Sequence, residues 1–129
     1  MKWNQEFSVG IQEIDEQHKT LADCVTSIEH AVIGRERWLA VHSALVRAVD
    51  FARIHFAVEE SLMRIHAYPM LGQHIGEHRR FSKNLERLQE KTLTADVSQE
   101  MIAFIRGWLE IHVPAHDKPY AAYFLTRTA

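Results

Sequence analysis

The sequence predicts an all-α fold, an up-down-up-down antiparallel four-helix bundle with an N-terminal arm and a short C-terminal tail. Apolar residues recur with helical period in four stretches. Alternating apolar and polar runs, which would indicate strands, are missing, and short loops between amphipathic helices favour antiparallel neighbours. A chain of 129 residues can bury a core by itself, so we expect one domain over residues 1–129.

The composition is that of an ordinary globular protein, with 47% hydrophobic residues, 25% charged residues and a net charge of -2. No basic surface for nucleic acid is indicated. The N-terminus has no apolar signal region and the chain has no run of about 18 apolar residues, so we expect no membrane span and a cytoplasmic location. We also expect a monomer. Cys24, the one cysteine, excludes an internal disulfide.

The first two helical stretches each carry polar residues inside an otherwise apolar face. The first face stops near Gly34, a residue that favours a helix C-cap, and the second ends at Pro69, which cannot continue a helix. The first face holds Ile14, His18, Leu21, Val25, Ile28 and Val32. The second face holds Trp38, Val41, Leu45, Ala48, Ala52, His55, Glu59 and Leu62.

The third and fourth stretches also carry polar residues inside an otherwise apolar face. The third face holds His74, His78, Phe81, Leu85 and Leu88, and the fourth holds Val97, Met101, Phe104, Trp108, Ile111 and His112. Asp96 and Ser98 are the candidate N-caps of the fourth helix. Apolar residues among the first dozen positions predict an arm laid across the bundle, and the aromatic residues of 119–129 predict a tail that covers one end.

Polar residues on the core faces form three pairs at a spacing of four. Side chains at i and i+4 lie on one helix face about one turn apart, so each pair can reach a common ion. The pairs are His55 with Glu59, His74 with His78, and His112 with His116, and His18 adds a histidine from the first helix. Because the helices alternate in direction, all four sets are expected at the same end of the bundle.

A buried cluster of imidazoles and carboxylates indicates a metal site, because such groups are costly to bury unless they are paired or bound to metal. Imidazole with few carboxylates suits iron, zinc, copper or nickel, whereas calcium and magnesium prefer oxygen. The candidate ligands outnumber those of a structural zinc site, which favours two ions with bridging carboxylates. Each histidine alone can be an ordinary hydrogen-bonded core residue, but that interpretation does not account for the set.

Four stretches of the chain resemble the bacterial hemerythrins in order and spacing. These stretches are VGIQEIDEQHKTL, HFAVEESLM, YPMLGQHIGEHRRF and WLEIHVPAHDKPY. The resemblance covers nearly the whole chain. It implies a four-helix bundle with a non-haem di-iron centre that binds dioxygen reversibly, in which an oxo or hydroxo group bridges two iron ions.

The resemblance also implies roles for individual residues, carried over position by position. The ligands of a coordinatively full iron would be His74, His78 and His112. The ligands of the second iron, which keeps an open position for dioxygen, would be His18 and His55. The bridging carboxylates would be Glu59 and Asp117. The apolar dioxygen pocket would be lined by Phe56, Trp108 and Leu109, residues that ordinary core packing would equally explain.

The segment IHVPAHD leaves two candidate partners for His112. On an α-helix the spacing favours His116, because five residues advance about 500° and leave Asp117 about 140° from His112. Pro114 cannot donate to the carbonyl of Glu110, so the helix is expected to kink or widen there. One bulged residue would return Asp117 to the face of His112, in agreement with the resemblance. His116 would then turn toward solvent or an outer contact.

We expect a dioxygen-binding protein, for oxygen carriage, storage or delivery, and not an enzyme. The alternatives are a di-iron redox enzyme acting on peroxide, nitric oxide or dioxygen, and a sensor of oxygen or nitric oxide. The enzyme is less favoured because the sequence lacks the Glu-x-x-His pairs of carboxylate-rich di-iron proteins. A metal held only for structure is the remaining alternative.

Overall fold

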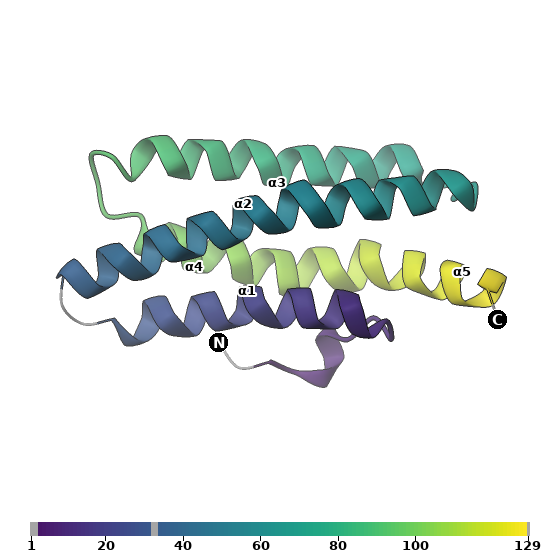
Figure 1. The fold of residues 1–129 in the computed structure, drawn as a ribbon, viewed down its shortest axis with the longest axis horizontal. Helices are drawn as coiled ribbons and strands as arrows, with labels where there is room; N and C mark the ends of the chain where they lie inside the picture. Colours follow the sequence, from purple (N-terminus) through teal and green to yellow (C-terminus); the bar gives the residue numbers. More distant parts are fainter. Residues whose placement is uncertain (1–2, 32–33, 129) are drawn as a thin grey trace.

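The computed structural model describes residues 3–31 and 34–128, and within these ranges the regular structure is entirely helical. Four rods run alternately up and down along a common direction (Figure 1). The first three are α1 (Gln12–His30), α2 (Gly34–Ile65) and α3 (Leu71–Lys91). The fourth rod is continuous and consists of α4 (Ser98–Gly107), the π-helix η2 (Trp108–Asp117) and α5 (Lys118–Thr128). The predicted all-α, up-down-up-down bundle is confirmed.

The helix ends differ from the sequence prediction in two places. Val97 is the N-cap of α4 and makes no side-chain cap hydrogen bond, so neither Asp96 nor Ser98 occupies that position, although the Asp96 carboxylate accepts a hydrogen bond of 2.8 Å from the backbone N–H of Ser98. Gly34 is the first residue of α2, so the expectation that it caps the preceding helix is wrong. The α1 helix already ends at His30, and Val32, assigned to its apolar face, lies outside the described residues.

The N-terminal arm is fastened to the first turn of α1. It contains a short 3-10 helix, η1 (Gln5–Phe7), and Val9 is buried against the main apolar core. The Asp15 carboxylate accepts hydrogen bonds from the Ser8 hydroxyl at 2.6 Å and from the Val9 N–H at 2.9 Å. Gly10 between them has a φ of 83°, a conformation that glycine adopts without strain. The predicted arm is confirmed.

The fourth rod widens where the sequence contains Pro114. In η2 the backbone follows π geometry from Trp108 to Asp117, and the N–H of Lys118 bonds the carbonyl of Val113, five residues earlier. Proline has no N–H with which to bond the carbonyl four residues before it, so α geometry is interrupted there. The predicted widening is confirmed. It also turns Ile111, which the sequence placed on the core face, to 71% exposure.

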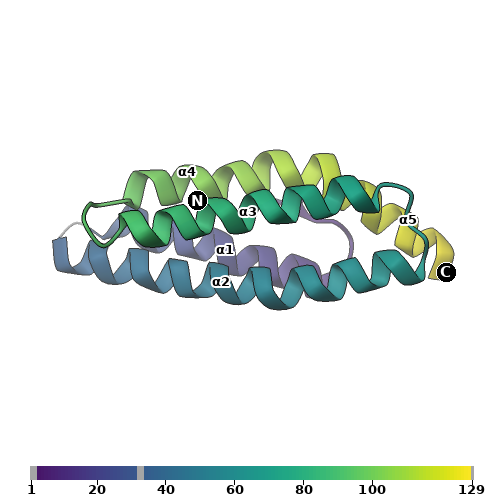
Figure 2. The same ribbon diagram turned by 90° about the horizontal axis from the view of Figure 1, so that it is seen from above.

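The C-terminal segment is a helix and not an irregular tail. α5 continues directly from η2 and lies at the end of the bundle where α2 passes into α3 (Figure 1, Figure 2). Its residue Tyr120 is buried with Met63 and Tyr68 in a second apolar cluster. The Tyr123 hydroxyl donates a 2.6 Å hydrogen bond to the carbonyl of His66. The segment therefore covers one end of the bundle, as expected, but with regular structure.

The apolar core fills the space between the four rods and follows the predicted faces closely. On α3, the apolar face residues Phe81, Leu85 and Leu88 are all buried. Trp38 is an exception, since it is 55% exposed and its ring lies on that of His42 at 4.0 Å. No helix in the described part of the chain is both long and apolar enough to cross a membrane.

Candidate metal centre

All seven residues assigned to the metal centre are buried at one end of the bundle. They come from all four rods, and each is at most 5% exposed. α1 supplies His18, α2 supplies His55 and Glu59, α3 supplies His74 and His78, and η2 supplies His112 and Asp117. Within the described residues, every buried histidine and every buried carboxylate belongs to this set. The arrangement expected from antiparallel directions is therefore present.

Glu59 lies between three imidazoles. Its carboxylate oxygens are 2.9 Å from the Nε2 atom of His55, 2.5 Å from that of His74 and 3.2 Å from that of His78. Burial would raise the pKa of this carboxyl, but the contacts with the three histidines outweigh burial and hold the pKa well below its ordinary value. Glu59 is thus an anion at neutral pH.

Asp117 holds the corresponding position on η2. Its carboxylate lies 3.1 Å from the Nε2 atoms of both His74 and His112 and 3.6 Å from that of His18. Burial and the charge of Glu59 would raise its pKa, and the contacts with His112 and His74 outweigh both, so the pKa is lowered. Both carboxylates therefore have pKa values below their ordinary range, and both contact the Nε2 atoms of the surrounding imidazoles.

The pKa values of two of these histidines are shifted in opposite directions. Burial would lower the pKa of His74, but contacts with Asp117 and Glu59 outweigh it and raise the pKa to about 9. Burial dominates at His18 and lowers its pKa to about 4, although Asp117 acts in the opposite direction. His74 therefore carries a proton in the metal-free centre, while His18 is neutral and offers a free lone pair.

The side-chain nitrogen and oxygen atoms of the centre are better placed to bind metal ions than to form hydrogen bonds with one another. Several buried polar atoms of the centre lie close together, but within the described part of the chain they have no partner with hydrogen-bond geometry, which is costly in a core. These atoms are both ring nitrogens of His18, both oxygens of Glu59, and Nε2 of His74 and His78. Ligand atoms of His74, His78 and His112 lie within 4.8 Å of one another, as do those of Glu59, His74 and Asp117. Converging, unsatisfied imidazole and carboxylate atoms are the donor set of a transition-metal site.

His116 lies outside this inner set. Its ring stacks on that of His112, with centroids 5.0 Å apart, and it is partly exposed. With Glu77 and Trp108 it lines a surface groove of about 380 Å³. The Nε2 atom of His112 instead contacts Asp117 at 3.1 Å. The structure therefore pairs His112 with the i+5 residue on the inner face, as the proline indicated.

The three residues assigned to a dioxygen pocket are buried against the imidazoles of α3 and η2. Phe56 stacks on His78 at a centroid distance of 3.8 Å, and Trp108 stacks on His112 at 3.5 Å. Leu109 is fully buried in the same core. These apolar side chains are placed to exclude water from one side of the centre, and their role toward dioxygen stays a prediction.

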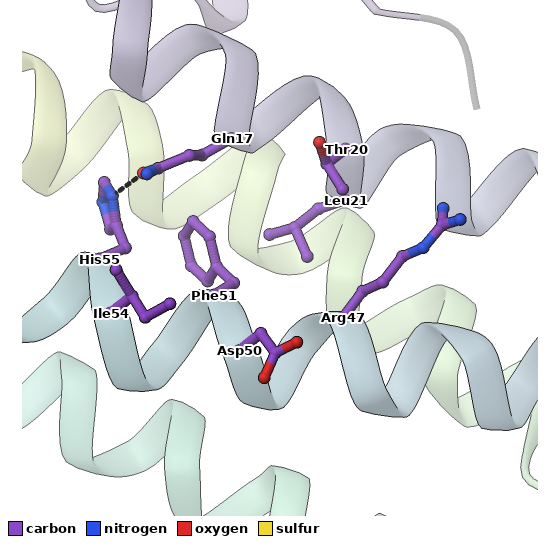
Figure 3. A pocket seen from close by; sticks show the side chains of 8 residues that line it. All are labelled: Gln17, Thr20, Leu21, Arg47, Asp50, Phe51, Ile54 and His55. Carbon is purple, nitrogen blue, oxygen red and sulfur yellow. Dashed lines mark hydrogen bonds between the residues drawn. The ribbon is translucent and has the colours of Figure 1, made fainter.

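The sequence did not identify the side chains that contact the outer ring nitrogens of the histidines. The Gln17 amide oxygen contacts Nδ1 of His55, as Figure 3 shows, and a Glu60 oxygen lies 2.8 Å from Nδ1 of His78. Phe51 stacks on His55 at 4.6 Å. Helical periodicity placed Gln17 and Glu60 beside the core faces. Their positions directly next to the candidate ligands His18 and Glu59 in the sequence were the available signal.

Two surface cavities meet at the contact between Gln17 and His55. One, of about 300 Å³, runs along α1 and α2 past Phe51 (Figure 3). The other, of about 320 Å³, reaches Glu59 and Tyr120. The buried Tyr120 hydroxyl has no hydrogen-bond partner among the described residues, and burial together with the charge of Glu59 raises its pKa to about 12. Solvent-accessible space therefore reaches the centre at His55, and the groove beside His116 reaches it at His112.

A four-helix bundle that gathers buried histidines and carboxylates from all four rods defines a class of metal-binding helical bundles. Within that class, this chain belongs to the hemerythrin family. The family model described as the hemerythrin HHE cation binding domain matches residues 9–123. The resemblance noted in the sequence is confirmed.

Individual relatives agree with the family model. The chain is 31% identical over 123 residues to the bacteriohemerythrin of Methylococcus capsulatus, covering 93% of each protein. It is 29% identical over 120 residues to that of Stenotrophomonas maltophilia, covering 92% of this chain and 78% of the relative. The myohemerythrin of Theromyzon tessulatum is 28% identical over 119 residues, with 92% and 89% covered. The similarity therefore spans nearly the whole chain.

Proposed function

We propose that this protein binds dioxygen reversibly at a non-haem di-iron centre and serves oxygen carriage, storage or delivery. The observation that carries the proposal is the set of seven buried side chains that converge at one end of the bundle, several of which have unsatisfied nitrogen or oxygen atoms. Five imidazoles and two carboxylates are enough for two ions with shared carboxylates. Membership of the hemerythrin family supports the same ligand chemistry.

The proposed ligand assignment follows the contacts of the two carboxylates. The ion without an open position would be held by His74, His78 and His112, whose donor atoms are grouped together. The other ion would be held by His18 and His55, whose ring centroids are 5.7 Å apart. The bridging groups would be Glu59, which contacts His55 and His78, and Asp117, which contacts His18 and His112. Each carboxylate thus touches histidines of both proposed ions.

Two ferrous ions held in this way would supply the electrons and the open coordination position that reversible dioxygen binding requires. The protein's part is to hold the ligands neutral and oriented and to keep water away. His18 is suited to binding because its lowered pKa leaves it unprotonated, whereas His74 must release its proton as an ion enters. Phe51 on His55 and Phe56 on His78 cover the imidazole faces with apolar surface.

The test is anaerobic reduction of the iron-loaded protein followed by cycles of exposure to air and removal of dioxygen. The expected result is two irons per chain and a visible absorption band that appears with dioxygen, fades on its removal and returns. His42→Ala is the matched control, because His42 packs on Trp38 away from the centre, and it should leave the band unchanged. A centre that goes irreversibly to one oxidised spectrum would refute the carrier, and steady consumption of dioxygen would indicate the enzyme. Size-exclusion chromatography of the same samples tests the expected monomer.

A further inference from the structure

Three ligand histidines have a side-chain partner on the outer ring nitrogen, and these partners differ in charge. Gln17 contacts Nδ1 of His55 through its neutral amide oxygen (Figure 3). The partners on the other two histidines are carboxylates: Glu60 contacts Nδ1 of His78 at 2.8 Å, and Glu77 lies 3.5 Å from Nδ1 of His112. Glu77 is also paired with Arg80 through its second oxygen, so the unbalanced charge among the three belongs to Glu60.

We propose that Gln17 is a positioning residue for His55, and that its neutrality makes His55 a weaker electron donor to metal than His78, which Glu60 contacts. The first half of this inference concerns the orientation of an imidazole and does not depend on dioxygen. The second half rests on the proposed function, because it concerns the relative stability of ferrous and ferric ions at the two positions.

The orientation of the Gln17 amide fixes which nitrogen of His55 can bind metal. A neutral imidazole carries one N–H, and its other nitrogen has the lone pair that a metal needs. In the metal-loaded protein, the Gln17 amide oxygen would accept the Nδ1–H of His55 and favour Nε2, which faces Glu59 at 2.9 Å, as the metal-binding nitrogen. An apolar residue at position 17 would remove this preference and allow the proton to occupy Nε2, where it would block the ligand atom.

The charge of the outer partner changes how strongly an imidazole donates to metal. A carboxylate that accepts the Nδ1–H draws the proton toward itself and makes the ring more basic, which favours the more highly charged ion. Glu60 does this for His78, whereas the amide of Gln17 does so much less for His55. The ion held by His74, His78 and His112 is therefore expected to favour the ferric state more than the ion held by His18 and His55.

Gln17 can be replaced without disturbing the core. It lines two surface cavities and is partly exposed, so substitutions there remove a contact without opening an internal void. This separates an effect on His55 from a loss of folding. Gln89, exposed on α3 far along the helix from the ligands, offers the same substitutions as a matched control.

The first experiment reads the protonated nitrogen of His55 in zinc-loaded protein by long-range proton–nitrogen NMR of the histidine rings, with zinc as a diamagnetic probe. The native protein should show His55 protonated at Nδ1, Gln17→Met should lose that preference, and Gln89→Met should match the native spectrum. Iron titration should show affinity for one of the two ions reduced about 10- to 100-fold in Gln17→Met. A His55 spectrum and iron affinities unchanged by Gln17→Met would overturn the positioning role, whatever the protein does with dioxygen.

The second experiment compares reduction potentials of iron-loaded Gln17→Glu and Glu60→Gln proteins. Gln17→Glu adds a carboxylate beside His55 and should stabilise the ferric state about tenfold, a shift of about 59 mV to lower potential. Glu60→Gln should shift a potential in the opposite direction, and Gln89→Glu should shift neither. Equal reduction potentials in all these proteins would overturn the inference that the charge of the outer partner tunes the imidazole. Dioxygen binding itself would still be tested separately, by the visible absorption band that appears with dioxygen.

Discussion

Replacing Asp117 or its neighbour His116 distinguishes the two possible partners of His112. The Asp117 carboxylate contacts His18, His74 and His112 and is 3% exposed. Losing an outer contact of a metal ligand already costs about 10- to 100-fold in affinity. Losing a shared ligand should cost at least about 100-fold, or about 2.8 kcal/mol. Asp117→Ala is therefore expected to bind fewer than two irons per chain.

His116→Ala should leave the centre intact. His116 stacks on the outer side of His112 and is partly exposed, and surface substitutions usually change the free energy of unfolding by less than about 0.5 kcal/mol. The assay is iron per chain after dialysis at a fixed free-iron concentration, with the visible spectrum as a second measurement. Loss of iron in His116→Ala together with full occupancy in Asp117→Ala would refute the π-helix assignment of the ligands.

Three further predictions concern the stability of the protein. In iron-free protein the raised pKa of His74, caused by Asp117 and Glu59 against burial, stabilises the fold below about pH 6.5, and this stabilisation is lost as the pH rises toward 9. The lowered pKa of His18, caused by burial, removes stability as the pH falls from about 6.5 toward 4. Thermal melting of iron-free protein should thus peak near neutral pH, and a flat profile would contradict both assignments. Phe81→Ala should cost about 3–5 kcal/mol in a urea titration because its side chain is 1% exposed in the core; a cost below 1 kcal/mol would contradict tight packing there. Tyr123→Phe removes the hydrogen bond to His66 and should cost about 1 kcal/mol in the same assay, with unchanged stability as the contrary result.

Periodicity was sufficient to predict where the candidate ligand histidines lie because an imidazole stands out against an otherwise apolar face. His74 and His78 occupy core positions of α3 whose other members are Phe81, Leu85 and Leu88, and all five are buried. Each histidine is visible in the sequence as a break in an otherwise regular pattern. Because neighbouring helices run antiparallel, these polar residues of the four rods could be placed at one level of the bundle without knowledge of side-chain contacts.

The outer contacts could not be predicted in the same way. Gln17 and Glu60 are polar residues next to the core face, where polar residues are ordinary, and only the rotations of the rods relative to each other bring them to His55 and His78. The prediction that Ile111 lies on the core face is wrong for a related reason, since a fixed period of 3.6 residues does not hold through a π-helix. Contacts that depend on the rotation of one helix relative to another, or on a local change of helical period, cannot be predicted from the periodicity of a single sequence.

The π-helix and the charge of the centre are connected through Asp117. On α2, ordinary α spacing brings Glu59 to the face of His55, whereas on η2 the wider helix brings Asp117, and not His116, to the inner face of His112. A continuous α-helix would present His116 there instead, leaving Glu59 as the single anion among six imidazoles. A lone carboxylate would bridge two dipositive ions less well and could not balance their charge as far. Pro114 thus acts at a distance of three residues, because the widened helix turns Asp117, and not His116, toward the candidate metal centre.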